Sequence, residues 1–389
     1  MTSGTLAKPT LRPSSPNFSC GPCAKHPGWS LANLKDAVLG RSHRAKLGKD
    51  RLKRAIDETK ALLELPSDYI VAIMAGSDTG AVEAALWSLL GPRPVDVFAW
   101  ESFGKDWVTD CLKQLKPLEA RSFTADFGKL PDLSQADFTH DVIFTWNGTT
   151  SGVIVPDANW INDTREGLTI CDATSSALAV PMPWHKLDVI TYSWQKVLGG
   201  EAQHGILILS PRAIARLENH KPLWPIPKIF RLTKDGKLNK GIFEGETINT
   251  PSMLCVEDAL DAMAWARSAG GVQGLSSRTQ ANYKTLSDWA ERTKWISFLC
   301  ADAAIRSPTS VCFKLSDTHM DKDAQAAFCK RIASLLETEG VAYDINSYRD
   351  APPGFRIWCG ATIEASDIKA LTLWLDWAYA VCSAEAKAA

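Results

Sequence analysis

Residues 191–200 read TYSWQKVLGG and follow an apolar-rich stretch, Leu187-Asp188-Val189-Ile190. A second stretch of this kind, Leu168-Thr169-Ile170-Cys171, ends at Asp172. We predict that both are strands, which places Asp172 at the end of one and Lys196 just after the other. A lysine and a carboxylate in these positions suit pyridoxal phosphate, because the amine forms a Schiff base and the carboxylate keeps the pyridine nitrogen protonated. Lys196 and Asp172 are therefore the candidate catalytic residues of a pyridoxal-phosphate site.

Strand and helix signals alternate along the first two thirds of the chain. This alternation predicts an α/β fold with a mostly parallel sheet that helices cover on both faces. Such sheets bind ligands at the carboxyl ends of their strands, and Asp172, Asn147 and Gly76 all fall at predicted strand ends. The predicted strands are 69–74, 95–99, 141–145, 167–171, 187–190 and 206–209, and the predicted helices are 82–90, 107–115 and 256–269.

The pattern changes after Gly270-Gly271, where we place a hinge. Predicted helices and strand-like stretches then form a compact α+β unit. The helices are 279–295, 323–337 and 367–379, and the strands are 310–315, 341–345 and 355–359. We therefore expect an N-terminal arm at 1–20, a large pyridoxal-phosphate-binding domain at 21–270 and a small C-terminal domain at 271–389.

The composition is that of a globular protein. The 389 residues are 45% hydrophobic, which is enough for a substantial core. A net charge of −1 creates no global field for nucleic acid or a membrane surface. The polar, proline-rich start lacks the apolar core of a signal peptide, and no apolar run is long enough to cross a bilayer. With ten dispersed cysteines that suggest reduced thiols, we expect a cytoplasmic protein that binds neither nucleic acid nor membrane.

Cys20 and Cys23 have the spacing of a thioredoxin-type redox pair. That chemistry places the first cysteine at the start of a helix, whereas Lys25-His26-Pro27-Gly28 cannot continue as a helix. We interpret the pair as a turn in an extended N-terminal arm.

Gly76-Ser77-Asp78-Thr79-Gly80 joins a predicted strand to a predicted helix. Backbone N–H groups and the helix dipole favour an anion at such a turn, so it suits a cofactor phosphate. An ordinary capped turn is the alternative. The turn has neither the Gly-Lys-Ser/Thr of a nucleotide P-loop nor the three glycines of a dinucleotide-binding turn. The presence of Lys196 and Asp172 favours the phosphate interpretation.

Several short motifs share one family resemblance. They are Asn17-Phe18-Ser19-Cys20-Gly21-Pro22, Ser42-His43-Arg44, Asp172-Ala173-Thr174-Ser175-Ser176, Gln195-Lys196 and Asn249-Thr250-Pro251. Together they resemble the phosphoserine aminotransferases, class V members of the fold-type-I pyridoxal-phosphate enzymes. The resemblance implies a large domain with a mostly parallel mixed sheet, a smaller α+β domain, and a homodimer with shared active sites.

The resemblance also implies a complete cofactor site. Lys196 would carry the cofactor and move a proton between Cα and C4′, and Asp172 would pair with the pyridinium nitrogen. Phe103 would stack on the ring, where the family more often has tryptophan, and Thr149 would hydrogen-bond near the ring hydroxyl. The phosphate would be bound by Ser77, Asp78 and Gln195, joined by Asn249 and Thr250 from the second subunit. No metal is implied.

Arginines are implied for substrate recognition, because both substrates carry two anionic ends. Arg356 would grip the α-carboxylate bidentately, which a lysine could not do. His43 and Arg44 of the second subunit would hold the distal phosphate or the γ-carboxylate of glutamate. Arg349 lies where the family has His-Arg, but a tyrosine precedes it here. Asp78 is a second departure, since better-known bacterial sequences carry an arginine at this point.

The implied reaction is transamination between L-glutamate and 3-phosphohydroxypyruvate, giving O-phospho-L-serine and 2-oxoglutarate for serine biosynthesis. The phosphohydroxythreonine reaction of pyridoxine biosynthesis is a possible second use. The alternatives are an alanine– or serine–glyoxylate aminotransferase, a cysteine desulfurase, and a non-catalytic protein that binds pyridoxal phosphate. A desulfurase needs a cysteine on a mobile loop, and a glyoxylate enzyme has less need of the second anion clamp at His43-Arg44.

Each candidate residue also has a plainer structural explanation. Lys196 alone would usually be a solvated surface charge, and Asp172 alone could be the N-cap of a helix. Arg356 could be an edge-strand charge that prevents aggregation, and His43-Arg44 a solvated basic turn. It is the combination of these residues that favours the enzyme.

Overall fold

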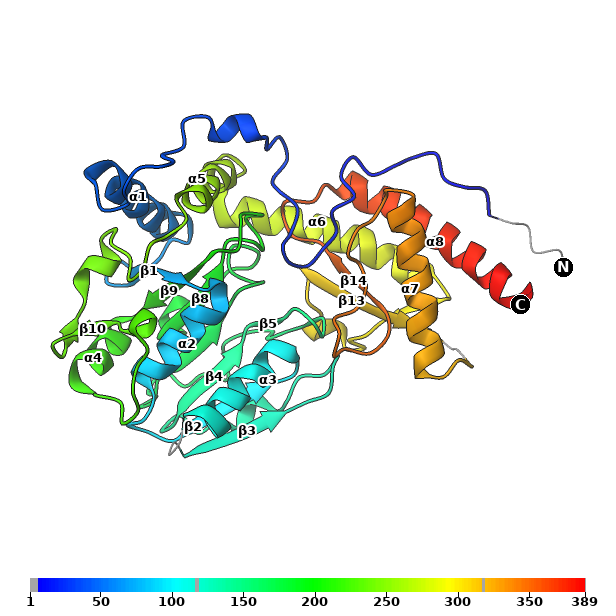
Figure 1. The fold of residues 1–389 in the computed structure, drawn as a ribbon. Coiled ribbons are helices and arrows are strands. Elements are labelled where there is room, and N and C mark those ends of the chain that lie inside the picture. Colours follow the sequence, from blue (N-terminus) through cyan, green and yellow to red (C-terminus); the bar gives the residue numbers. More distant parts are fainter. Residues whose placement is uncertain (1–5, 116–118, 317–318, 389) are drawn as a thin grey trace.

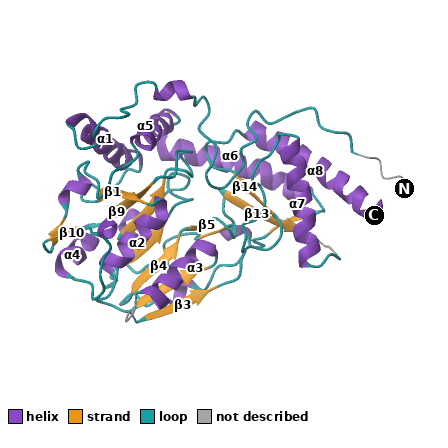
Figure 2. Cartoon of the chain, in the orientation of Figure 1, coloured by secondary structure: helices purple, strands orange, loops and turns teal. Residues whose placement is uncertain are grey.

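The structure is a computed structural model that describes residues 6–115, 119–316 and 319–388. It has a larger part built on a seven-stranded sheet and a smaller C-terminal part built on a three-stranded sheet, as Figures 1 and 2 show.

The seven-stranded sheet has the strand order β1-β9-β8-β7-β4-β2-β3. Only β9 runs against its neighbours, since it is antiparallel to both β1 and β8, whereas the other pairs are parallel. The predicted α/β fold with a mostly parallel sheet is therefore confirmed. The strands are β1 (Ile70–Ala75), β2 (Val95–Ala99), β3 (Ala120–Thr124), β4 (Asp141–Thr145), β7 (Thr169–Asp172), β8 (Val189–Ser193) and β9 (His204–Leu209).

Helices cover the sheet on both faces, and each face has its own apolar core (Figure 1). Neighbouring residues of a strand point to opposite faces, so Ile143 joins one core and Phe144 the other. The first core includes residues of α2 (Ser77–Leu89), α3 (Ser102–Thr109) and α4 (Pro211–Asn219). The second includes residues of α1 (Lys46–Leu62) and α5 (Met253–Ser268).

The C-terminal part has a three-stranded antiparallel sheet flanked by long helices. Its helices are α6 (Gly271–Arg292), α7 (Lys322–Thr338) and α8 (Ala365–Ala388), and its strands are β12 (Ile296–Phe298), β13 (Ser310–Leu315) and β14 (Phe355–Trp358). The N-terminal segment bridges the two sheets (Figure 1). The carbonyl of Phe18 accepts a hydrogen bond from the Trp358 N–H at 3.0 Å, and the Cys23 N–H donates to the carbonyl of Gln195 at 2.8 Å.

Several predicted elements differ from the structure. The helices predicted at 82–90, 279–295 and 367–379 correspond to α2, α6 and α8, which are longer. The predicted strand at 341–345 is wrong: Tyr343 makes only an isolated bridge to Asn17, and the left-handed Asp344 (φ 55°) interrupts the extended backbone. The helix predicted at 107–115 begins at Ser102 and ends in a π-helical turn, Asp110–Gln114. Its earlier start follows from Glu101, whose side chain caps the helix by accepting a hydrogen bond from the Gly104 N–H.

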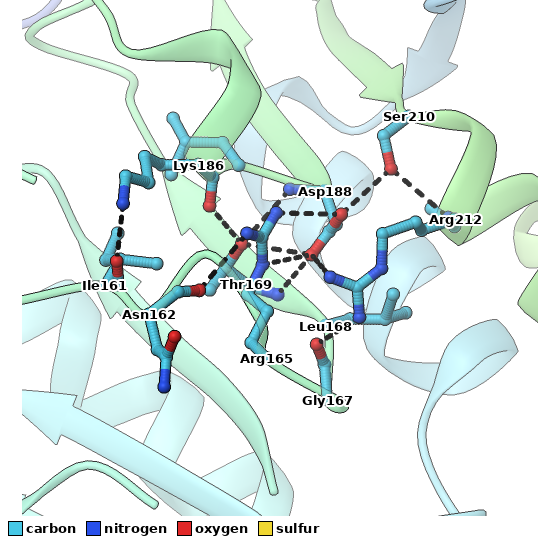
Figure 3. Close-up of polar contacts among 12 residues, drawn as sticks. Ile161, Asn162, Arg165, Gly167, Leu168, Thr169, Lys186, Asp188, Ser210 and Arg212 are labelled. Carbon is cyan, nitrogen blue, oxygen red and sulfur yellow. Dashed lines mark hydrogen bonds and ion pairs between the residues drawn. The ribbon is translucent and has the colours of Figure 1, made fainter. Parts of the chain in front are cut away.

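A polar network ties the sheet together at the amino ends of its strands (Figure 3). Its centre is Asp188, which is 1% exposed. The carboxylate accepts hydrogen bonds from the Arg165 guanidinium at 3.0 and 3.2 Å, from the Thr169 N–H at 3.0 Å and from the Ser210 hydroxyl at 3.1 Å. Because every partner is in place, this buried charge is satisfied by the fold itself.

Within the described residues, no helix combines the length and the apolar character that a membrane span requires.

Candidate active site

The candidate site is a cavity at the carboxyl edge of the seven-stranded sheet. Because β1, β4, β7 and β8 run in the same direction, the residues that follow these strands meet at this edge. The cavity is lined by Ser77, Asp78, Thr79, Glu101, Phe103, Trp107, Thr145, Asn147, Thr149, Asp172, Thr174, Ser175, Gln195 and Lys196. Seven predicted site residues are among them, namely Ser77, Asp78, Phe103, Thr149, Asp172, Gln195 and Lys196.

Lys196 follows β8 and is buried, with 7% of its surface exposed. Burial lowers the pKa of its amine, and the nearby Arg356 cation lowers it further. The amine donates a hydrogen bond to the carbonyl of Cys20 in the N-terminal segment. That segment passes so close that a Cβ added to Gly21 would lie 2.2 Å from Lys196 Nζ, so a residue without a side chain is needed there. Lys196 forms no ion pair with an acidic residue in the described parts of the chain.

Asp172 is the last residue of β7 and is also buried. Its carboxylate accepts a hydrogen bond from the indole N–H of Trp107 at 3.2 Å and another from the Thr174 N–H at 3.0 Å. No cationic side chain forms an ion pair with Asp172 among the described residues. The carboxylate is thus held in place by neutral donors, and its charge remains available for a cation that enters the cavity.

Sequence reasoning assigned no tryptophan to the cofactor and therefore missed Trp107. It lies four residues after Phe103 on α3, so the two side chains share one face of the helix. That spacing was the signal that could have identified Trp107.

A buried network fixes Thr149. Its hydroxyl donates to the Ser175 hydroxyl at 2.7 Å, and Ser175 donates to the carbonyl of Asn147 at 3.0 Å. The side-chain amide of Asn147 also donates to the Ser175 hydroxyl at 2.7 Å. The loop after β4 is therefore tied to the loop after β7, and Thr149 is held on the same cavity wall as Asp172.

The turn after β1 has the geometry of an anion site. Gly76 has a left-handed backbone (φ 83°), and α2 begins at the next residue, Ser77. Free N–H groups in the first turn of α2 and the helix dipole favour a phosphate there. The Asp78 carboxyl is buried, and both this burial and the neighbouring Asp172 carboxylate raise its pKa well above the usual range. A raised pKa disfavours the charged form of Asp78 and so weakens the repulsion between this carboxyl and a bound phosphate.

Unsatisfied polar atoms show that the cavity suits a polar ligand. Among the described residues, three buried oxygen atoms of cavity-lining side chains have no hydrogen-bond partner. They belong to Thr145, Asn147 and Gln195. Native proteins satisfy nearly all such groups, so this concentration marks a place where a ligand supplies partners. Pyridoxal phosphate fits the donor set, because its amine-reactive carbonyl, ring nitrogen and phosphate correspond to Lys196, Asp172 and the α2 N-terminus.

Glu101 is a cavity residue that sequence reasoning missed. It directly follows Trp100 at the end of β2, so the rule that ligands bind at strand ends could have identified it. The fully buried carboxyl accepts hydrogen bonds from the Gly104 N–H at 2.6 Å and from the Thr150 hydroxyl at 3.0 Å. Burial and the neighbouring Asp172 raise the pKa of Glu101 to about 7. Glu101 thereby joins α3, which carries Phe103, to the loop that carries Thr149.

The two predicted substrate arginines come from the C-terminal part. Arg356 lies in β14 and is half-buried, while Arg349 lies on the exposed loop before it. Both guanidinium groups lie over the ring of Tyr348, with Cζ 5.4 Å from its centroid in each case. The Tyr348 ring in turn lies 5.6 Å from the ring of Phe103. The arginines are thus connected to the cofactor cavity through two aromatic rings.

Six predicted site residues do not line this cavity, namely Arg349, Arg356 and four others. His43 and Arg44 border a separate pocket together with Thr247, and Asn249 and Thr250 follow two residues later in the chain. Burial lowers the pKa of His43, and the adjacent Arg44 cation lowers it further. His43 and Arg44 therefore line a different pocket from Lys196, and neither Asn249 nor Thr250 is part of the Lys196 cavity lining.

Cys20 and Cys23 are free and buried thiols, and the backbone around them packs against the Lys196 loop. Burial raises the pKa of both thiols above the usual range. A raised pKa is the opposite of what a redox-active thiol requires. No cluster of His, Cys, Asp or Glu suited to a metal ion occurs in residues 6–115, 119–316 and 319–388.

Comparison with known proteins identifies relatives over nearly the whole chain. No protein-family model matches it. Over 372 residues it is 58% identical to the phosphoserine aminotransferase of Methanosarcina mazei, which covers 96% of this chain and 99% of that protein.

Solved structures show the same fold. A phosphoserine aminotransferase from Cytophaga hutchinsonii has a TM-score of 0.79 at 24% identity, covering 92% of this chain and 97% of that one. An alanine–glyoxylate aminotransferase from Nostoc sp. has a TM-score of 0.74 at 18% identity, covering 96% of both chains. Because enzymes with different substrates share this fold, the choice of substrate depends on the site residues.

Proposed function

Because the chain belongs to the phosphoserine aminotransferase family, we propose that it transfers the amino group of L-glutamate to 3-phosphohydroxypyruvate. The products are O-phospho-L-serine and 2-oxoglutarate, as in serine biosynthesis. The expected family, the fold and the class of pyridoxal-phosphate-dependent transaminase are confirmed by the 58% identity over 96% of the chain and by the shared fold. The mechanism rests on Lys196 and Asp172, which line the same cavity and have no ion-pair partner among the described residues.

The chain's own residues bind and orient the reacting groups. When bound, pyridoxal phosphate supplies an electron sink that stabilises negative charge at the substrate Cα. Asp172 keeps the ring nitrogen protonated, and Trp107 and Thr174 orient that carboxylate. Lys196 would hold the cofactor covalently and, once the substrate amine replaced it, would take the proton from Cα. The lowered pKa of its amine favours the neutral form that this proton transfer requires.

The remaining roles belong to the same proposal. Phe103 stacks on the ring, Thr149 contacts the ring hydroxyl, and Arg356 binds the α-carboxylate. The phosphate is bound by Ser77, Gln195 and the backbone of Asp78. We also propose that the chain has an N-terminal arm at 1–20, a large domain at 21–270 and a small domain at 271–389, and that the protein is cytoplasmic.

A homodimer completes this site. His43, Arg44, Asn249 and Thr250 lie apart from the Lys196 cavity of their own subunit, which supports their use in the cavity of a second subunit. The segments near them also expose apolar side chains that a subunit interface would bury. These include Leu31 (77% exposed), Leu39 (54%), Leu47 (43%) and Leu254 (46%).

Spectroscopy tests the reaction. We expect purified protein to be yellow, glutamate to bleach the visible band, and 3-phosphohydroxypyruvate to restore it. An acceptor panel would include glyoxylate and a phosphohydroxythreonine-type substrate. If glyoxylate with alanine cycles the band much faster than the phosphorylated acceptor, the substrate assignment is wrong although the cofactor assignment stands.

Subunit mixing tests the shared site. Lys196→Ala and Asn249→Ala should each be nearly inactive alone, whereas their hybrid dimer contains one site with both native residues. We expect activity to return when the two variants are unfolded and refolded together. Absence of recovery, with hybrid dimers demonstrated by mass, would contradict a site built from both subunits.

A further inference from the structure

Arg356 differs from the other inward-facing arginines because it has no acidic partner among the described residues. Arg165 pairs with Asp188 at 3.0 Å, and Arg216 pairs with Asp141 at 2.8 Å. Arg356 forms no such pair, and its Nε is buried without a hydrogen-bond partner. The position of the Arg356 guanidinium must therefore be fixed by a group that is not a carboxylate.

Tyr348 is the residue that contacts this cation. The Cζ atom of Arg356 lies 5.4 Å from the centroid of the Tyr348 ring, within the range of a cation–π interaction. The Tyr348 ring also contacts Phe103, which lines the cofactor cavity; the two ring centroids lie 5.6 Å apart. Tyr348 therefore contacts both a side chain of the cavity lining and the arginine.

The chemistry of this contact explains why a ring suits the position. A carboxylate would occupy the planar N–H donors of the guanidinium and neutralise its charge. An aromatic ring attracts the cation through its quadrupole and accepts none of its conventional hydrogen bonds. The ring can therefore hold Arg356 in place while all its donors remain free for a substrate carboxylate.

We propose that Tyr348 is a positioning residue that holds Arg356 ready for the carboxylate of a dianionic amino or keto acid. Arg349 lies at the same 5.4 Å from the Tyr348 ring, so a second positive charge lies at this place. Its only described ion pair is a 3.7 Å contact with the adjacent, exposed Asp350. Two cations on one neutral ring favour a substrate with two negative charges. The inference rests on the proposed function and deepens it.

Binding of glutarate to the pyridoxal-phosphate-loaded enzyme, measured by calorimetry, tests the proposal. Glutarate has the two carboxylates of glutamate but no amino group, so its affinity reports the anion clamp without turnover. Tyr348→Leu keeps most of the volume and removes the π-system, so we expect its Kd to rise roughly three- to tenfold. Tyr348→Phe retains the ring and should restore most of the lost affinity.

A double-mutant cycle separates positioning from general packing. In an Arg356→Lys background, Tyr348→Leu should change the Kd much less, because the lysine lacks the planar guanidinium that the ring holds. Equal losses in both backgrounds, or an unchanged Kd in Tyr348→Leu, would overturn the proposal. Failure of the proposed function is a different outcome: the wild type would then bind glutarate but fail to bleach with glutamate.

Discussion

Buried charged side chains at the amino ends of the strands of the seven-stranded sheet have ion-pair partners, whereas those at the carboxyl ends do not. We call these two sides of the sheet the amino edge and the carboxyl edge. At the amino edge, Asp188, Asp141 and Asp96 each pair with an arginine, at 3.0, 2.8 and 2.7 Å (Figure 3 shows the first). At the carboxyl edge, Lys196 and Asp172 have no ion-pair partner among the described residues. Both edges are buried, so the difference lies in the partners and not in access to water.

This difference separates residues that stabilise the fold from residues that await a ligand. A buried charge whose partners come from the chain is costly to disturb, because removing one partner leaves the other uncompensated. A buried charge without a partner lowers the stability of the empty protein and becomes favourable only when a ligand completes it. Four substitutions, two of them with a matched comparison variant, test this division.

The largest expected effect is that of Lys196→Ala on catalysis. Loss of covalent attachment and of the proton-transferring amine should lower the transamination rate by roughly a thousandfold or more and abolish the visible band. The free energy of unfolding of the cofactor-free protein should fall little, because the buried amine that is removed has no acidic partner among the described residues.

Lys186→Ala is the matched control for the lysine. Lys186 lies at the amino edge and donates to the carbonyl of Ile161 at 2.8 Å. Its loss should leave the visible band and the rate intact. If Lys196→Ala markedly lowered the free energy of unfolding of the cofactor-free protein, Lys196 would be a residue that stabilises the fold, which would contradict the difference between the two edges.

Asp188→Asn should have the largest effect on stability. It leaves Arg165 buried without its counter-charge, so we expect a loss of about 3–5 kcal/mol in the free energy of unfolding, measured in urea. The rate per folded molecule should change little, because the network lies at the opposite edge from Lys196. Asp172→Asn is the reciprocal variant, with strongly reduced activity and a much smaller loss of stability in the cofactor-free state.

Glu101→Gln should remove a pH dependence of stability. In the folded protein Glu101 keeps its proton up to about pH 7, whereas an unfolded glutamate releases it near 4.5. The unfolded state therefore binds fewer protons in this window, and the Glu101 contribution to stability falls as the pH rises from 4.5 through 7. Between these limits the wild type should lose on the order of 3 kcal/mol relative to Glu101→Gln.

Urea unfolding of both cofactor-free proteins at several pH values measures this difference. Parallel stability curves for the two proteins would show that Glu101 does not titrate in the window. Such a result would contradict the raised pKa of Glu101.

Arg121→Gln should have the smallest effect. Arg121 is half-exposed, and its partner Asp96 also accepts hydrogen bonds from the Asp137 N–H at 2.9 Å and from His140 at 3.0 Å. Because these remain, we expect a loss of about 1 kcal/mol or less in urea unfolding. A loss as large as that of Asp188→Asn would show that the amino-edge pairs act as one cooperative unit.

The sequence predicted the central strands well because they are buried on both faces and read as continuous apolar runs. It missed β3, whose residues Ala120–Thr124 include Arg121 and two hydroxyl side chains, because an edge strand is partly exposed and need not be apolar. It also missed α1, although Leu52, Ala55, Ile56 and Leu62 have helical spacing.

The same limit applies to the candidate site. Seven predicted residues share the cavity because each follows a strand, and strand ends of a parallel sheet meet. The contacts of Tyr348 with Arg356 and Phe103 could not be predicted from strand ends. The contact with Phe103 joins segments that are far apart in the chain.

The sequence by itself determined the order of strands and turns, and with it which side chains reach the carboxyl edge. That information is local, because apolar periodicity and turn residues act over a few neighbouring positions. Only the tertiary structure decided which buried charges are paired. Asp188 directly precedes β8 and Asp172 ends β7, and Arg165 reaches only Asp188. The reason is physical: a charge is satisfied by groups within hydrogen-bonding distance, and folding alone brings those groups together.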